Sequence, residues 1–166
     1  MSLYARYVFP FINEWLSVGQ RVDKQRRLAL ADARGQVLEL GFGTGLNFKH
    51  YPFSVTHVTG IDCERMRPRQ VEQRIDSAPV PITTMYRDAS HGLLFPDESF
   101  DTVVTTWTLC SIHEVIPTLT EIRRVLRPNG SYLFLEHGPS DDPRIARRQA
   151  LLRPVVELIG AGCQVN

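Results

Sequence analysis

The chain has 166 residues, of which 43% are apolar and 22% charged, and its formal net charge is +1. This length and composition indicate one domain with a substantial core, and the balanced charge excludes a general attraction to nucleic acid or anionic membrane. The three cysteines form no zinc-type cluster with histidine, which favours reduced thiols in a cytoplasmic protein over a disulfide framework or metal site. We find no signal-peptide pattern and no apolar run near the ~18 residues of a membrane span.

Helical spacing of apolar side chains dominates the start of the chain. It predicts one helix over residues 3–16, kinked at Pro10, and a second from Val22 to Ala33 that ends at Gly35. A last helix is expected over residues 142–159. Its arginines leave two readings open: a solvated face, or contact with an acidic ligand or an anionic lipid surface, which would be a peripheral membrane contact.

Short apolar runs bounded by turn residues follow the second helix, with helical stretches between several of them. This alternation predicts an α/β fold, in which a parallel sheet carries helices on both faces. The Asn129-Gly130 pair predicts a turn directly before the last strand. The predicted strands cover residues 37–40, 57–61, 82–86, 102–106 and 132–135.

A glycine-rich turn follows the first predicted strand and reads Glu39-Leu40-Gly41-Phe42-Gly43-Thr44-Gly45. In α/β proteins such a turn brings backbone close to a nucleotide, because glycine accepts positive φ and has no Cβ to hold the ligand away. Asp62 ends the next apolar run, where a carboxylate can accept both ribose hydroxyls of an adenosine.

The spacing of this turn distinguishes between adenosine cofactors. A dinucleotide turn has the pattern G-x-G-x-x-G, whereas here Leu46 stands at the third glycine position. Glu39 at the mouth of the loop would repel a pyrophosphate but suits a cationic or zwitterionic ligand. No Walker lysine follows the glycines, which excludes a P-loop. A nicotinamide-dependent oxidoreductase is therefore the less favoured alternative.

The E-x-G-x-G-x-G pattern closely resembles motif I of the class I S-adenosylmethionine (SAM) dependent methyltransferases. Further segments resemble that family in its order and spacing, from about Val37 to Leu135. The closest similarity is to small methyltransferases related to ubiquinone and menaquinone biosynthesis, including the group with thiol- and phospholipid-methylating members. The segments are Asp62, Arg87-Asp88-Ala89, the run FPDESFDTVV from Phe95, Leu126-Arg127-Pro128-Asn129-Gly130, Gly45-Leu46-Asn47-Phe48 and Glu136-His137-Gly138.

The resemblance implies S-adenosyl-L-methionine as cofactor, S-adenosyl-L-homocysteine as product and a small-molecule or lipid-like acceptor; it implies no metal and no nucleic acid. Should the acceptor have to lose a proton, the candidate bases are His113, Glu136 and His137, although structural histidines are commoner. Trp107 is either a core residue or a wall of the acceptor pocket, and Asp101 has a structural role. The implied cofactor-binding residues are Glu39, Gly41, Phe42, Gly43, Thr44, Gly45, Asp62, Cys63, Asp88, Ala89 and Thr106.

The resemblance also implies an organisation for the chain. Residues 1–166 form one methyltransferase domain, with a helical lid over 1–35, a SAM-binding core over 36–138 and a C-terminal helix over 139–166. The Rossmann-like sheet lacks the last two strands of the family. The fifth strand is then an exposed edge, which predicts a homodimer or aggregate. A non-catalytic SAM-binding regulatory protein is the alternative to an enzyme, and the acceptor atom stays open.

Overall fold

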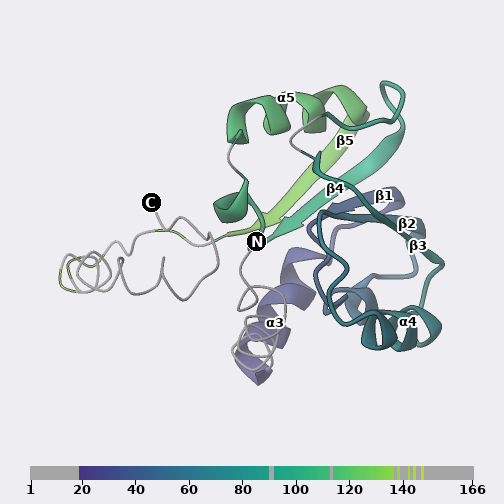
Figure 1. The fold of residues 1–166 in the computed structure, drawn as a ribbon, viewed down its shortest axis with the longest axis vertical. Coiled ribbons are helices and arrows are strands. Elements are labelled where there is room, and N and C mark those ends of the chain that lie inside the picture. Colours follow the sequence, from purple (N-terminus) through teal and green to yellow (C-terminus); the bar gives the residue numbers. More distant parts are fainter. Residues whose placement is uncertain are drawn as a thin grey trace.

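A sheet of five parallel strands lies at the centre of the molecule, in the order β3-β2-β1-β4-β5 (Figure 1). The computed structural model describes residues 19–89, 92–112, 114–136, 138, 142, 144 and 147. The helix expected over 3–16 and most of the helix expected over 142–159 lie outside these residues. The strands are β1 (Gly35–Leu40), β2 (Val55–Asp62), β3 (Ile82–Tyr86), β4 (Phe100–Thr106) and β5 (Leu126–Leu135).

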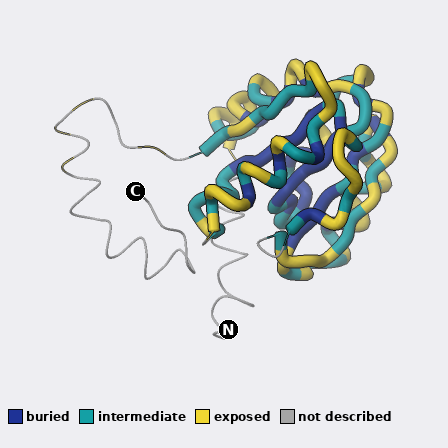
Figure 2. Tube along the Cα trace, turned by 90° about the horizontal axis from the view of Figure 1, so that it is seen from above, coloured by how far each residue is buried: buried dark blue, intermediate teal, exposed yellow. Residues whose placement is uncertain are grey.

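Helices cover both faces of this sheet, which confirms the predicted α/β class. The helices α3 (Gln20–Ala29) and α4 (Pro68–Asp76) lie on one side, and α5 (Val115–Val125) lies on the other (Figure 1). Each layer encloses its own apolar cluster: Phe48 and Val71 belong to the first, and Phe100 and Ile122 to the second. The strands between the layers are the most buried part of the chain (Figure 2). This burial on both faces explains their nearly continuous apolar sequence.

The strand order places a reversal at the middle of the sheet. β1 pairs with β2 on one side and with β4 on the other. The chain runs outwards from β1 through β2 to β3, and then outwards from β4 to β5 on the opposite side. In open α/β sheets, ligands bind at the carboxyl ends of the strands at such a switch point. The glycine-rich turn follows β1 directly, as the sequence predicted.

The predicted second helix ends too late. α3 stops at Ala29, because the chain then turns so that Leu30 and Ala33 enter the core, where both are almost completely buried. Gly35 is the first residue of β1 with a φ of 62°, and a side chain there would overlap Asp101. Gly35 therefore allows β1 to pack closely against Asp101 of β4, and it does not end a helix.

The turn predicted at Asn129-Gly130 lies inside β5 instead of before it. Leu126 pairs with Phe100 and Ser131 with Thr102, so the residues between them form a bulge. Asn129 has a φ of 66°, the left-handed conformation that asparagine tolerates. The turn itself was predicted correctly, but β5 already pairs with β4 at Leu126, before the turn.

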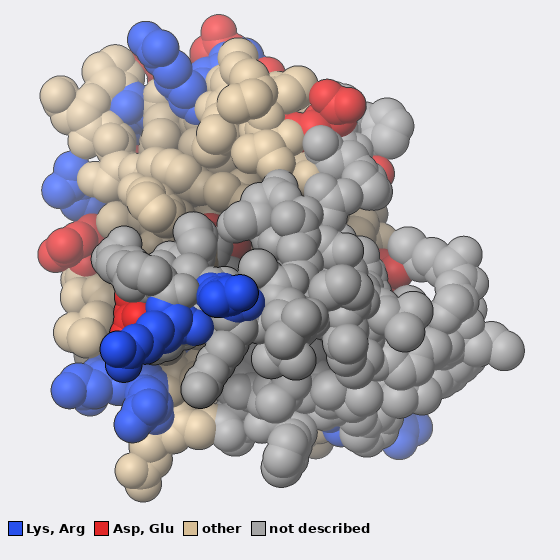
Figure 3. All heavy atoms as spheres, turned by 90° about the vertical axis from the view of Figure 1, so that its left-hand side faces the viewer, with Lys and Arg blue, Asp and Glu red and all other residues tan. Residues whose placement is uncertain are grey.

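Both signs of charge occur on the described surface. On one face, Lys and Arg side chains lie beside Asp and Glu side chains (Figure 3). This mixture agrees with the balanced charge of the sequence.

Candidate functional site

The glycine-rich loop has the backbone conformation that the sequence predicted. Gly41, Gly43 and Gly45 all have positive φ, at 72°, 56° and 80°. A side chain at Gly41 would overlap Thr108, so this glycine allows the loop to pack on the chain that follows β4. At Gly43 a Cβ would meet only Met66, at 4.0 Å. The backbone at Gly43 is therefore the least crowded of the three glycines of the loop.

Asp62 ends β2 beside this loop and is only 6% exposed. Its Oδ2 accepts a hydrogen bond from the Gly43 N–H at 2.7 Å, and its Oδ1 accepts one from the Glu64 N–H at 3.0 Å. Burial raises the pKa of the Asp62 carboxyl, against the effect of these two N–H groups. A carboxylate has about four acceptor positions, so Asp62 can both hold the loop and accept hydroxyl donors.

Glu39 lies beneath the loop rather than at its mouth, which corrects the position expected from the sequence. It is 1% exposed, its Oε1 accepts from Asn47 Nδ2 at 2.8 Å, and its Oε2 accepts from the Tyr51 hydroxyl at 2.7 Å. Burial raises the pKa of Glu39, while the hydrogen bonds from Tyr51 and Asn47 lower it. The carboxylate therefore acts first as the anchor of the segment after the glycines.

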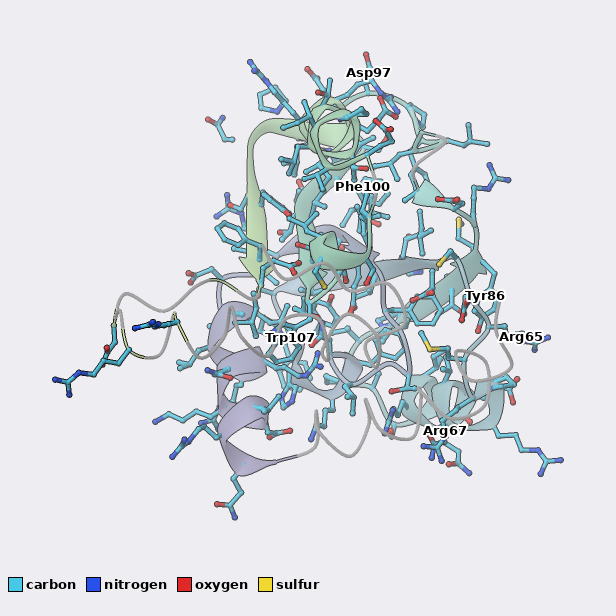
Figure 4. The ribbon with its side chains drawn as sticks, turned by 60° about the vertical axis from the view of Figure 1, so that its left-hand side comes forward. Arg65, Arg67, Tyr86, Asp97, Phe100 and Trp107 are labelled. Atoms are coloured by element: carbon cyan, nitrogen blue, oxygen red, sulfur yellow. The ribbon has the colours of Figure 1, made fainter. Side chains whose placement is uncertain are left out.

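Arg26 is a site residue that the sequence analysis missed. It lies on α3, is 7% exposed, and donates from Nη1 to Asn47 Oδ1 at 2.7 Å and to Thr106 Oγ1 at 3.3 Å. Its guanidinium carbon lies 4.5 Å from the centre of the ring of Trp107, which Figure 4 labels. A signal was present, because Arg26 is four residues from both Val22 and Leu30 on the apolar row of the helix.

Thr106 and Trp107, at the end of β4, complete this cluster. The Thr106 side chain is buried, and its hydroxyl accepts from both Arg26 and Asn47. Its contact with a cofactor stays a prediction. Trp107 is half-buried and has a φ of 51°, a conformation rare for a bulky residue. It stacks on Arg26, and a role as a wall of the acceptor pocket stays a prediction.

The remaining cofactor candidates are spread around the loop. The Phe42 side chain is in the core against Phe48 and Tyr86, which leaves only its backbone for a ligand. The Thr44 carbonyl accepts from Arg74 at 2.6 Å. Cys63 is exposed at the end of β2, and desolvation together with nearby carboxylates raises the pKa of its thiol to about 11.

Asp88 and Ala89 follow β3. Asp88 is exposed, whereas Ala89 lines a cavity of about 300 Å³ together with Ile61, Met85 and Leu93. This cavity is mostly apolar and lies at the carboxyl ends of β2 and β3.

Glu136 is the one candidate base within the described residues; His113 and His137 lie outside them. Its Oε1 accepts from the N–H groups of Thr108 and Leu109, at 3.1 and 3.2 Å. It thereby fastens the end of β5 to the 3-10 helix η3 (Leu109–Ser111). Within the part of the chain that is described, its buried Oε2 has no hydrogen-bond partner.

Among the described residues, no helix is both long and apolar enough to cross a membrane. The cytoplasmic location expected from the sequence stays a prediction. The same holds for the division into lid, core and C-terminal helix.

Comparison with known proteins gives a family match and several relatives. Residues 38–134 match the family described as "Methyltransferase domain". A phosphatidylethanolamine N-methyltransferase of Cereibacter sphaeroides is 33% identical over 78% of this chain and 65% of its own length. A thiol S-methyltransferase of Rattus norvegicus is 32% identical over 95% of this chain and 70% of its own length.

A solved structure of a SAM-dependent methyltransferase from Thermotoga maritima has the same fold. Its TM-score is 0.67 at 18% identity, over 98% of this chain and 72% of the other. The chain spans less than two thirds of the length of several curated relatives, for example 57% of the thiol S-methyltransferase of Mus musculus.

Proposed function

This chain belongs to the methyltransferase domain family, and on that premise we propose that it transfers a methyl group to a small, lipophilic or lipid-like acceptor. The cofactor is S-adenosylmethionine. The observation that carries the proposal is the pairing of Asp62 with the Gly43 N–H at the switch point of the sheet. An acid in this place can accept the ribose hydroxyls of an adenosine, and the glycine spacing, with Leu46 at the third glycine position of a dinucleotide turn, disfavours a pyrophosphate.

The residues present suit the parts of this cofactor. We assign the ribose hydroxyls to Asp62, the adenine to Asp88 and Ala89 beside the cavity, and the backbone contact to Gly43 and its neighbours in the loop. The buried polar cluster of Glu39, Asn47 and Arg26 lies at the carboxyl ends of β1 and β4, next to the loop. These assignments agree with the sequence resemblance.

The bound cofactor supplies an electrophilic methyl group on a sulfonium with a neutral leaving group. The protein's task is then to align the acceptor in line and to exclude water. A proton acceptor is required only for an acceptor atom that carries a proton to be lost. Glu136 is the described candidate, and His113 and His137 are the others.

Two relatives suggest the acceptor class. One is named for phosphatidylethanolamine and the other for thiols, and both acceptors combine a nucleophilic amine or sulfur with an apolar body. We therefore propose a lipophilic amine or thiol as acceptor. The alternative is a regulatory protein that binds the cofactor without turnover.

Calorimetric titration with S-adenosylhomocysteine tests the cofactor site. Replacing Asp62 by Asn should weaken binding about 10- to 100-fold, the range of a lost charge-assisted hydrogen bond. The matched control is Asp76→Asn, which removes an exposed carboxylate at the end of α4 and should leave binding unchanged. NADH should not bind; tight NADH binding would support the oxidoreductase alternative.

Turnover with labelled SAM separates the enzyme from the regulatory protein. The acceptors to compare are an aliphatic thiol and phosphatidylethanolamine in vesicles. Methylation of either supports the proposal and identifies the acceptor atom. Binding of S-adenosylhomocysteine without turnover on either acceptor would favour the regulatory alternative.

A further inference from the structure

A buried cation and a buried anion are held apart by a single amide beside the glycine-rich loop. Asn47 accepts from Arg26 Nη1 at 2.7 Å through its oxygen and donates to Glu39 Oε1 at 2.8 Å through its nitrogen. Among the described residues, the ion pairs within 4.0 Å do not include Arg26. The two charges are thus neighbours that are kept from neutralising each other directly.

The guanidinium of Arg26 is incompletely satisfied. Among the described residues, its hydrogen bonds go to the neutral oxygens of Asn47 and Thr106, and its buried Nε has no hydrogen-bond partner. Burying a charged donor without an acceptor is costly, and proteins normally pair such groups. Burial also lowers the pKa of Arg26, against the effect of the nearby Glu39 carboxylate.

The surroundings fix the orientation of this guanidinium. Asn47 holds one end and the Trp107 ring lies against its face, at 4.5 Å from the guanidinium carbon. Such a planar, stacked arginine is preorganised to donate to a planar anion. A carboxylate is the anion that arginine binds with two parallel hydrogen bonds.

We propose that Arg26 binds the carboxylate of the amino-acid tail of the cofactor, with Asn47 and Trp107 as its positioning residues. The inference rests on the assignment of S-adenosylmethionine and is independent of the acceptor. The tail is a zwitterion, and the site has charges complementary to it: the Arg26 cation meets the carboxylate, and the buried Glu39 anion favours the ammonium. The carboxylate is the one anionic group of this cofactor.

A comparison of two ligands on four proteins tests this inference. The ligands are S-adenosylhomocysteine and its decarboxylated analogue, which keeps the amine. The proteins are the unaltered chain, Arg26→Gln, Arg26→Lys and Arg27→Gln, and calorimetric affinity is the readout. Arg27→Gln is the matched control, because this neighbour on α3 is exposed and the charge change is the same.

The unaltered chain should bind S-adenosylhomocysteine about 10- to 100-fold more tightly than the analogue. Arg26→Gln should reduce this ratio to within about threefold, Arg26→Lys should give an intermediate ratio, and Arg27→Gln should leave it unchanged. Thermal unfolding shows whether each variant is folded. If Arg26→Gln is unfolded, the inference is tested by the affinity ratio of the two ligands on the unaltered chain and on Arg26→Lys.

Three results would overturn the inference. Equal affinity of the unaltered chain for both ligands would overturn it alone, with the cofactor assignment intact. An equal loss for both ligands in Arg26→Gln would show that the arginine only organises the loop. Failure of S-adenosylhomocysteine to bind the unaltered chain would instead overturn the cofactor assignment, and the inference with it.

Discussion

At the scale of single residues, Glu39 shows how one carboxylate serves the whole loop. Its two oxygens accept from Asn47, after the last glycine, and from Tyr51, beyond the 3-10 helix η1 (Phe48–His50). The side chain thereby connects the end of β1 to the segment that the glycines release. The Tyr51 hydroxyl is buried with it, and desolvation, with the nearby carboxylate, raises the pKa of Tyr51 well above its usual value.

Replacing Glu39 by Gln should destabilise the fold. The amide nitrogen of Gln is a donor that must face either the Tyr51 hydroxyl or the Asn47 amide, both of which donate in the native structure. We expect a loss of about 1–3 kcal/mol in the free energy of unfolding, measured by urea denaturation. Glu72→Gln, an exposed site on α4, is the control and should cost little. Equal stability of the two variants would contradict the anchoring role.

At the scale of elements, α5 holds the connection between β3 and β4. Arg124 donates to the carbonyl groups of Leu93 and Phe95 at 2.7 and 2.8 Å and pairs with Asp97 at 2.7 Å (Figure 4 labels Asp97). Glu121 binds Arg124 through both oxygens and accepts from the Leu93 N–H. The FPDESFD segment, which resembles a family motif, is therefore fastened by two residues of one helix.

The stability of this connection should depend on pH through Glu121. The hydrogen bonds from Arg124 and then from the Leu93 N–H lower the pKa of Glu121 to about 2, from 4.5. Because the folded pKa is the lower one, the stabilisation is fully present above about pH 4.5 and is lost as the pH falls towards about 2. The urea midpoints of the unaltered chain and Glu121→Gln should therefore converge over this interval.

The control for that experiment is Glu72→Gln, whose carboxylate is exposed. Its midpoint should follow that of the unaltered chain throughout the interval. A difference between the unaltered chain and Glu121→Gln that stays constant from about pH 6 to about pH 2 would show that the Glu121 charge does not matter.

At the scale of the whole molecule, β5 forms one edge of the sheet and carries an exposed aromatic side chain. Within the described residues, β5 pairs only with β4, and its Phe134 side chain is 62% exposed beside Tyr132. An edge strand with exposed aromatic side chains is a template for pairing with another chain. The homodimer expected from the sequence stays a prediction, and this edge is where we place it.

Light scattering over a range of concentrations tests association through β5. The chain should form dimers or larger species, and Phe134→Lys should shift them towards the monomer, because a charge at an edge disfavours pairing. Phe53→Lys is the matched control, since Phe53 is 87% exposed but follows η1, far from β5 in the sheet order. A monomer at every concentration, or equal effects of both variants, would refute the prediction.

The sequence by itself determined the parallel α/β class, the strands β1 to β4 within two residues at each end, and the positive φ of the loop glycines. These features have local signals, namely apolar runs, turn residues and glycine spacing. It also placed Asp62 beside the loop, because strand order follows from the alternation of elements.

Only the tertiary structure decided which polar side chains share the site. Arg26 and Thr106 are hydrogen-bonded across 80 positions of sequence, and the apolar row of the helix, although it includes Arg26, does not identify its partners. The tertiary structure also decided that Glu39 lies beneath the loop, where it accepts from Asn47. It decided as well that β5 begins to pair with β4 before its turn. Burial and pairing depend on what packs against a residue from distant elements, and no local pattern contains that information.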